Sequence, residues 1–254
     1  MIINTALLRF AVQPNILASG IKILELCKLS YKAGKFIKED HGMADYLQQT
    51  IEEGDTIADV GSHQGNYIYL MRKKLKESGK IIAFGTNSFL HEQLVYLKKI
   101  FDWKNVHLEF LTLSNISGTK KIYLTDPNGA ALININDNYK RFATRKILVH
   151  TLDDYFNRNN IRPDLLKIDA DGNELKILQG AVNTLMKQKP KILLKCEERI
   201  AGARKVMDTL NLLTQLGYKG HFFLDSIRIP LVNFDFNIYQ NPCNDFYCSH
   251  FVFE

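Results

Sequence analysis

The sequence predicts an α/β fold in which helices cover both faces of a mostly parallel sheet. Short apolar runs, such as Thr56–Val60 and Lys80–Phe84, alternate with longer stretches in which apolar residues recur every three or four positions. Runs of the first kind are typical of buried parallel strands, and stretches of the second kind are typical of amphipathic helices. Their alternation implies right-handed crossovers between parallel strands. No linker or internal repeat interrupts the pattern, so one main domain is expected.

Seven main strands are expected between residue 56 and the end of the chain. They lie at 56–60, 80–84, 106–113, 164–168, 191–196, 218–224 and 250–253. Most of them are separated by helical patterns, of which one presents Leu90, Leu94, Leu97 and Phe101 on a single face. The last two strands have no helix between them. We therefore expect the sheet to end in an antiparallel, hairpin-like pair.

The middle of the chain departs from this alternation. Strand-like runs at 121–124 and 131–135 flank a turn that contains Pro127 and Gly129, and a further run follows at 145–150. Turn-forming residues between short apolar runs indicate antiparallel pairing. An antiparallel insertion is therefore expected at 119–150.

The chain before the first strand is fairly apolar, but charged residues interrupt it. Residues 1–45 are expected to form an N-terminal helical extension, and residues 46–254 the main domain. No apolar run approaches the roughly 18–20 residues that a membrane span requires, and the N-terminus does not match a signal peptide. Four cysteines are few for this length, which favours a reducing cytoplasm over a disulfide scaffold.

Two helices are expected to begin with a capping box, in which a short polar side chain and an acidic residue lie three positions apart. Thr151 and Asp154 form the first pair, and Asp171 and Glu174 form the second. The helix after the second pair would place a single apolar face on the sheet. That face consists of Leu175, Leu178, Ala181 and Leu185.

The net charge of +6 is mildly basic and does not decide the class of partner. The densest basic cluster contains Arg72, Lys73, Lys74 and Lys76. A solvated helix surface explains this cluster, and nucleic-acid binding is the alternative; no nucleic-acid partner is expected. Cys243, Cys248 and His250 lie close together, but their spacing matches none of the usual zinc sites, so no metal site is expected.

The turn after the first strand is the place to look for a ligand, because open parallel sheets bind ligands beyond the carboxyl ends of their strands. This turn contains Asp59, Gly61 and Gly65. Gly61 would let the backbone turn sharply, and Gly65 would let the next helix start close to a ligand with free N–H groups. A turn without a ligand fits the pattern equally well. The pattern differs from the dinucleotide fingerprint, which disfavours NAD.

Three segments together resemble the FkbM-type family of S-adenosylmethionine-dependent methyltransferases. They are 54–61 with Gly65, 151–154, and 164–181, and the resemblance extends over about residues 35–254. It implies a Rossmann-like class I methyltransferase fold, whose seven-stranded sheet has a late antiparallel strand. It also implies S-adenosylmethionine as the cofactor. The reaction implied is O-methylation of a hydroxyl group on a sugar, a glycan precursor or a secondary metabolite.

The resemblance also implies roles for individual residues. The residues expected to line the methionine end of the cofactor are Asp59, Gly61 and Gly65, and Ser62 and His63 of the same turn are also expected to bind the cofactor. Those expected to face the ribose are Gly85, Thr86 and Asn87, and those expected near the adenine are Leu113 and Ser114. Asp169 would lie beside the transferable methyl group and orient or deprotonate the acceptor. Further candidate catalytic residues are Glu197 and His63.

Each of these roles has a plainer alternative. Asp59 can instead cap backbone amides, and His63 can be a turn residue without a chemical role. Glu197 can lie on the surface, or it can hold a cation together with Asp169. Lys167, on a buried strand, is expected to extend to solvent or to pair with a carboxylate; the alternative is that it lowers the pKa of an acceptor.

The sequence departs from the family where the cofactor should bind. Gly85 and Thr86 stand where the family usually has an acidic residue followed by proline, and the acid normally accepts hydrogen bonds from the ribose hydroxyls. Lys195 stands where the family usually has glutamate. Either Asn87 or a water replaces the ribose contact, or the fold has become a catalytically degenerate binding or regulatory module. The insertion at 119–150 is expected to contribute to the choice of acceptor.

Overall fold

The computed structural model describes residues 41–123, 144–244 and 246–254. Its strands are β1 (Thr56–Val60), β2 (Lys80–Gly85), β3 (Val106–Phe110), β4 (Thr112–Leu113), β5 (Gly118–Tyr123), β6 (Thr144–His150), β7 (Leu165–Ile168), β8 (Lys191–Lys195), β9 (Gly220–Leu224), β10 (Ile227–Pro230) and β11 (His250–Phe253). Its helices are α2 (His41–Thr50), α3 (Asn66–Leu75), α4 (Ser88–Phe101), α5 (Leu152–Asn159), α6 (Glu174–Gln179), α7 (Val182–Lys187), α8 (Glu198–Ala201), α9 (Ala203–Gln215) and α10 (Phe236–Tyr239), with a 3-10 turn at Leu231–Asn233.

The main sheet has the strand order β10-β9-β11-β8-β7-β1-β2-β3. Neighbouring strands from β8 to β3 are parallel, whereas β11 is antiparallel to both β8 and β9. This arrangement confirms the predicted Rossmann-like α/β fold with a late antiparallel strand.

Two details of the predicted sheet were wrong. The described part of the chain forms eight strands in this sheet rather than seven, because Ile227–Pro230 turns back and pairs with β9. The last two predicted strands, β9 and β11, do form the expected antiparallel pair, but β11 is not at the end of the sheet. Instead, β11 is inserted between β8 and β9, where Phe251 pairs with both Leu194 and Phe222.

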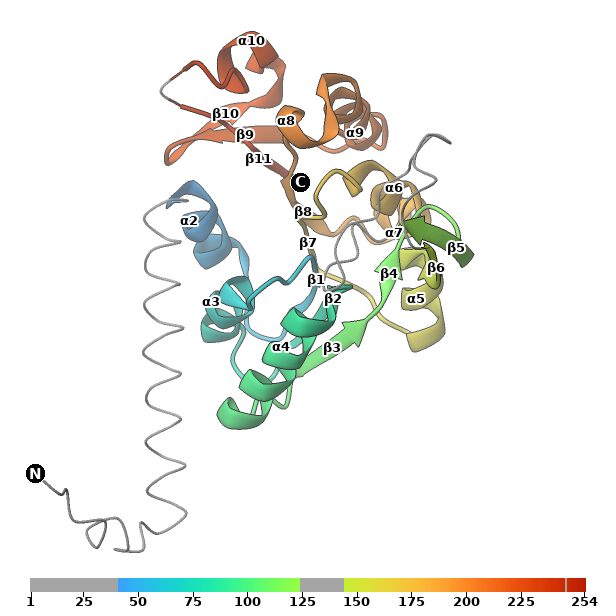
Figure 1. Cartoon of the computed structure of the whole chain (residues 1–254). Helices are drawn as coiled ribbons and strands as arrows, with labels where there is room; N and C mark the ends of the chain where they lie inside the picture. The colour runs from blue at the N-terminus through green and yellow to red at the C-terminus, as the bar shows by residue number, and fades with distance from the viewer. Residues whose placement is uncertain (1–40, 124–143, 245) are drawn as a thin grey trace, which may run out of the picture.

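Helices cover both faces of the sheet (Figure 1). On one side, α2, α3 and α4 contribute Leu47, Met71 and Leu94 to a buried cluster. On the other side, α5, α6, α7 and α9 enclose a second cluster that includes Phe156 and Leu210. Alternate residues of each central strand enter opposite clusters, as the two-residue period of a strand requires. Burial on both faces explains why the strands are apolar without a polar side.

A three-stranded sheet of order β4-β6-β5 lies outside the main sheet. β5 and β6 are antiparallel, and β4 is parallel to β6. The single strand expected at 106–113 is therefore divided, because β3 belongs to the main sheet and β4 to the small one. The expected strand at 131–135 lies outside the described residues.

Half of the first predicted capping box agrees with the structure, because Thr151 Oγ1 accepts a hydrogen bond of 3.0 Å from the amide of Asp154. The reciprocal bond is not formed, since the Thr151 amide donates to Ser117 Oγ at 3.0 Å instead. The second predicted box was wrong. Asp171 is exposed and has a positive φ of 46°, and Asn173 precedes α6 without a side-chain cap. Glu174 reaches back to the preceding loop instead, as described below.

The single helix expected after Glu174 is broken into α6 and α7 at Gly180 and Ala181. At Gly180 a Cβ atom would lie 2.2 Å from the carbonyl oxygen of Ser114, so only glycine allows this close approach. The amino end of α7 is capped from α5: the carboxylate of Asp153 accepts hydrogen bonds from the amides of Asn183 and Thr184 at 2.9 and 2.8 Å.

α2 spans residue 45, where the boundary between extension and main domain was expected, and residues 1–40 lie outside the described part of the chain. Met43 and Leu47 of this helix are 2% exposed and join the core. Within the residues that the structure describes, no helix is long and apolar enough to cross a membrane. The described cysteines, Cys196, Cys243 and Cys248, are free thiols.

The basic cluster of the sequence lies at the carboxyl end of α3. Arg72 pairs with Glu77, and Lys76 pairs with Glu53. Cations in the last turn of a helix also complement its dipole. These contacts agree with a solvated helix surface, although they leave the choice of partner untested.

Candidate functional site

A cavity of about 460 Å³ lies at the carboxyl ends of the central parallel strands. The chain runs from β1 to β2 and β3 on one side of the sheet, and it then returns to the other side of β1 to form β7 and β8. Such a reversal leaves a crevice between the helices that leave β1 and β7 in opposite directions. The residues that line the cavity are Gly61, Ser62, His63, Gln64, Asn66, Tyr67, Ala83, Gly85, Thr86, Asn87, Leu90, His91, Leu94, Lys167, Asp169, Asp171 and Lys195.

Gly61 ends β1 and packs directly against the end of β7. A Cβ atom at this position would lie 1.8 Å from the carbonyl oxygen of Asp169, and the φ of Gly61 is +81°. The backbone is held on both sides: the Gly61 amide donates to the carbonyl of Phe84 at 3.0 Å, and the Asp169 amide donates to the carbonyl of Val60 at 3.0 Å. Both steric space and backbone conformation therefore require glycine here.

The turn continues into α3 without a side-chain cap. Gly65 precedes the helix with a φ of +83°, and His63 has a φ of +44°. The Ser62 hydroxyl donates to the carbonyl of Asp59 at 3.0 Å, and the Gly65 amide donates to the carbonyl of Ser62 at 2.9 Å. The amino end of α3 therefore lies at the cavity, which Asn66 and Tyr67 help to line, and a helix amino end favours anionic groups.

Asp59 does not line the cavity but supports it from behind. Its side chain is fully buried, and a carboxylate oxygen lies 3.0 Å from the Nζ of Lys167, whose side chain is 3% exposed. The same ammonium donates to the carbonyl of Gly61 at 2.7 Å and lies 4.7 Å from the centre of the Tyr67 ring. The expectation that Lys167 pairs with a carboxylate is confirmed. The pair joins β1 to β7 beneath the turn.

The end of β2 presents open space rather than a carboxylate. A Cβ atom at Gly85 would have no atom within 4 Å, so the position has room for a side chain. The next two residues, Thr86 and Asn87, also line the cavity. The Asn87 side-chain oxygen accepts from the amide of Leu90 at 3.1 Å and so caps α4.

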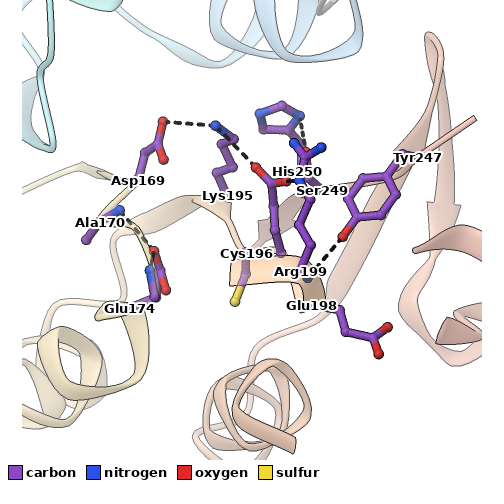
Figure 2. A network of polar contacts seen from close by, with 12 residues as sticks. Asp169, Ala170, Glu174, Lys195, Cys196, Glu198, Arg199, Tyr247, Ser249 and His250 are labelled. Carbon is purple, nitrogen blue, oxygen red and sulfur yellow. Dashed lines mark hydrogen bonds and ion pairs between the residues drawn. The ribbon is translucent and has the colours of Figure 1, made fainter. Parts of the chain in front are cut away.

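Carboxylates and cations alternate at the ends of β7 and β8 (Figure 2). The Nζ of Lys195 lies 3.7 Å from a carboxylate oxygen of Asp169 and 3.4 Å from one of Glu197. Glu197 is almost fully buried and also pairs with Arg199. Partial burial opposes the charge of Lys195, but the neighbouring carboxylates of Asp169 and Glu197 outweigh it and hold the pKa of Lys195 above its usual value.

Glu174 shapes the loop that follows Asp169. One carboxylate oxygen accepts hydrogen bonds of 3.0 Å from the amides of Ala170 and Gly172 (Figure 2 shows the first). Burial raises the pKa of Glu174 even though these amides favour its charged form. The loop is thus tied to the start of α6, which fixes where the Asp169 side chain leaves the strand.

The structure brings together most, but not all, of the residues expected at the site. Five expected residues do not line the cavity: Asp59, Gly65, Leu113, Ser114 and Glu197. Leu113 and Ser114 are each 5% exposed, and Leu113 belongs to the core. They lie buried beside β6, where Ser114 donates to the carbonyl of His150.

Several lining residues were not expected from the sequence. They are Gln64, Asn66, Tyr67, Ala83, Leu90, His91, Leu94, Lys167, Asp171 and Lys195. Leu90, His91 and Leu94 occupy the first two turns of α4, and Lys195 is the last residue of β8. Only their position in the sequence could have indicated a place at the site, because residues that directly follow a parallel strand, or begin the helix after it, face the ligand edge of the sheet.

The sequence profile of the FkbM methyltransferase domain matches residues 59–219. Among solved structures, the FkbM methyltransferase from Methylobacillus flagellatus KT has 13% sequence identity and a TM-score of 0.55, over 80% of this chain and 44% of that chain. This chain therefore spans less than half the length of that protein. No curated protein matches the sequence.

Two further solved structures resemble the chain more distantly. An O-methyltransferase from Bacillus cereus, in complex with S-adenosylhomocysteine, has 10% identity and a TM-score of 0.48 over 83% of this chain and 78% of that chain. Fibrillarin from Aeropyrum pernix, with bound S-adenosyl-L-methionine, has 11% identity and a TM-score of 0.46 over 82% and 72%. Because the profile match covers more than half of the sequence, the chain belongs to the FkbM family of S-adenosylmethionine-dependent methyltransferases.

Proposed function

We propose that this protein transfers a methyl group from S-adenosylmethionine to a hydroxyl group of a small-molecule or carbohydrate acceptor, such as a sugar, a glycan precursor or a secondary metabolite. The observation that carries the proposal is the cavity at the switch point of the sheet. Gly61 forms its turn and Asp169 stands at its wall. Membership of the family supports the type of reaction, and the cavity is a site in which that reaction can take place.

The residues of the cavity fit this cofactor in most respects. Its volume of about 460 Å³ lies within the roughly 300–1,000 Å³ that small-molecule sites occupy. The amino end of α3, where Asn66 and Tyr67 line the cavity, suits the carboxylate of a methionine moiety. Gly61 keeps the turn free of a side chain. At the end of β2, Gly85 and Thr86 supply no carboxylate for the ribose, so Asn87 or a water would make that contact.

Methyl transfer requires the protein to align the acceptor with the cofactor and to remove one proton from the acceptor, because the cofactor supplies a methyl group already activated on a sulfonium. The acceptor oxygen forms the new bond to carbon, while the bond from sulfur to carbon breaks and its electron pair remains on sulfur. The hydroxyl proton passes to a base. Asp169 is the candidate base, because it is the carboxylate that ends β7 and faces the cavity. His63, which also lines the cavity, is the alternative.

A second candidate is a catalytically degenerate binding or regulatory module. Two observations favour it. Gly85 leaves the ribose without the carboxylate that is usual in the family, and the candidate base Asp169 is already paired with Lys195. Such a protein would bind the cofactor or a related ligand without transferring the methyl group.

The two candidates are separated by a methyl-transfer assay with labelled S-adenosylmethionine and a panel of hydroxylated sugars, sugar phosphates and phenols. We expect label in at least one acceptor, and we expect Asp169→Asn to reduce transfer by roughly 100-fold or more. Cofactor binding by that variant should change only a few-fold. Asp208→Asn, on the exposed face of α9, is the matched control. Cofactor binding without transfer to any acceptor would favour the second candidate.

A further inference from the structure

Lys195 places a fixed positive charge between two carboxylates of the cavity. Its Nζ lies 3.7 Å from Asp169 and 3.4 Å from Glu197. The side chain of Lys195 is 33% exposed and lines the cavity. In Figure 2 the ammonium stands next to Asp169, with Arg199 beyond it.

We propose that Lys195 is the resident cation of the site: its ammonium occupies the position in which Asp169 and Glu197 would otherwise bind a divalent metal ion. Lys195 would then orient the acceptor oxygen without a metal. This inference rests on the proposed methyl transfer and adds a positioning residue to it.

The ligand chemistry of the pair supports the first step. Carboxylate oxygens are the ligands that Mg²⁺ and Mn²⁺ prefer in proteins. Asp169 and Glu197 extend from the ends of neighbouring parallel strands, β7 and β8. Both can reach a common cation, because both already contact the same ammonium. Without Lys195 the pair would be a site for a divalent ion.

The charge balance supports the second step. Glu197 is also paired with Arg199, so two carboxylates face two cations within this cluster. These four side chains balance one another in charge, and Asp171, which also lines the cavity, is a further carboxylate near Lys195. A divalent ion would add two positive charges beside the lysine ammonium, which already lies within 4 Å of both carboxylates. Repulsion at this short range would expel the metal rather than the tethered side chain.

The hydrogen-bonding capacity of the ammonium supports the third step. A lysine ammonium has three N–H donors and no acceptor. Within the described chain its ion-pair partners are Asp169, at 3.7 Å, and Glu197, at 3.4 Å, so at least one donor remains for the oxygen of an acceptor. A fixed positive charge beside that oxygen stabilises the negative charge that develops as the proton leaves for Asp169.

The test is a titration with Mn²⁺, followed by the electron paramagnetic resonance signal of the free ion. It uses the unmodified protein, Lys195→Met, and Lys195→Met combined with Glu197→Gln. We expect Lys195→Met to bind one Mn²⁺ at least tenfold more tightly than the unmodified protein. The added Glu197→Gln substitution should abolish that gain, because it removes one of the two ligands.

Lys76→Met is the matched control, because Lys76 also neutralises a glutamate, Glu53, but at the surface. This variant should gain no Mn²⁺ binding. If Lys195 formed only a structural salt bridge, its substitution by methionine would change the stability of the protein without creating a metal site. Lys195→Gln provides a second neutral variant if Lys195→Met does not fold.

Equal Mn²⁺ affinity of the unmodified protein and both neutral variants would overturn the proposal. So would a tight Mn²⁺ site in the unmodified protein that Glu197→Gln removes. The titration needs neither cofactor nor acceptor. A gain of Mn²⁺ binding in a protein that shows no methyl transfer would therefore overturn the proposed function while leaving the position of the cation established.

Discussion

At the scale of single residues, the tightest constraint in the site is at Gly61. Its α-carbon faces the backbone of Asp169, so any side chain would push β1 and β7 apart. The sequence predicted a sharp turn at this glycine, because it follows a buried strand. It did not predict the contact with Asp169, since that contact depends on the pairing of strands that lie more than 100 residues apart.

We predict that Gly61→Ala lowers the free energy of unfolding by roughly 3 kcal/mol, because it combines a positive φ with a backbone clash. Gly54→Ala is the control: its φ of +98° is also positive, but no atom lies within 4 Å of the added Cβ. That variant should lose only about 1–2 kcal/mol. Urea unfolding measures both values. Equal losses would show that the clash with Asp169 does not constrain the turn.

The same scale shows why some residue roles could not be predicted. Asp59 and Lys167 both lie in buried strands, and their ion pair depends on β1 and β7 being neighbours in the sheet. For Lys195 the sequence showed a departure from the family but not the carboxylates around it. Leu113 and Ser114 were expected near the adenine; Leu113 is the last residue of β4, which belongs to the small sheet, Ser114 follows it, and neither lines the cavity.

At the scale of elements, the loop between β7 and α6 is organised by one buried acid. Its sequence suggested a capping box, since Asp171 and Glu174 have the correct spacing. The structure uses Glu174 differently, because the φ of Asp171 is positive and its side chain is exposed. Local spacing identifies helix starts when the cap is local, as at Thr151, and fails when a buried side chain bonds to the loop before it.

We predict that Glu174→Gln becomes more stable relative to the unmodified protein as pH rises from about 4 to about 7. Burial raises the folded-state pKa of Glu174 above its unfolded value. The folded state therefore holds this proton more tightly, and stability is lost as pH rises through the folded pKa. Glutamine carries no proton to lose and keeps an oxygen for the amides of Ala170 and Gly172.

Urea unfolding of both proteins across this pH range measures the difference. Glu92→Gln, at an exposed position on α4, is the control and should show no such trend. A difference that shrinks as pH rises would contradict the account, because it would mean that the carboxylate form of Glu174 stabilises the fold.

At the scale of the whole molecule, the central strands were predictable because β1, β2, β7 and β8 are short, apolar and buried on both faces. β10 was not, since its Ile227–Pro230 run is short and largely exposed. The position of β11 between β8 and β9 could not be predicted from local sequence patterns either, because strand pairing depends on packing across the sheet. The cavity lies where the strand order reverses at β1, an order that only the structure shows, whereas the turn after β1 was predicted from the sequence as the place for a ligand.

The central claim is that this cavity binds S-adenosylmethionine, and calorimetric titration with S-adenosylmethionine and S-adenosylhomocysteine tests it most directly. We predict one site of micromolar affinity in the unmodified protein. Gly85→Glu should bind roughly tenfold more tightly, because open space at this position lets a carboxylate accept hydrogen bonds from the ribose. No heat of binding with either protein would contradict the claim and would require a different ligand for the cavity.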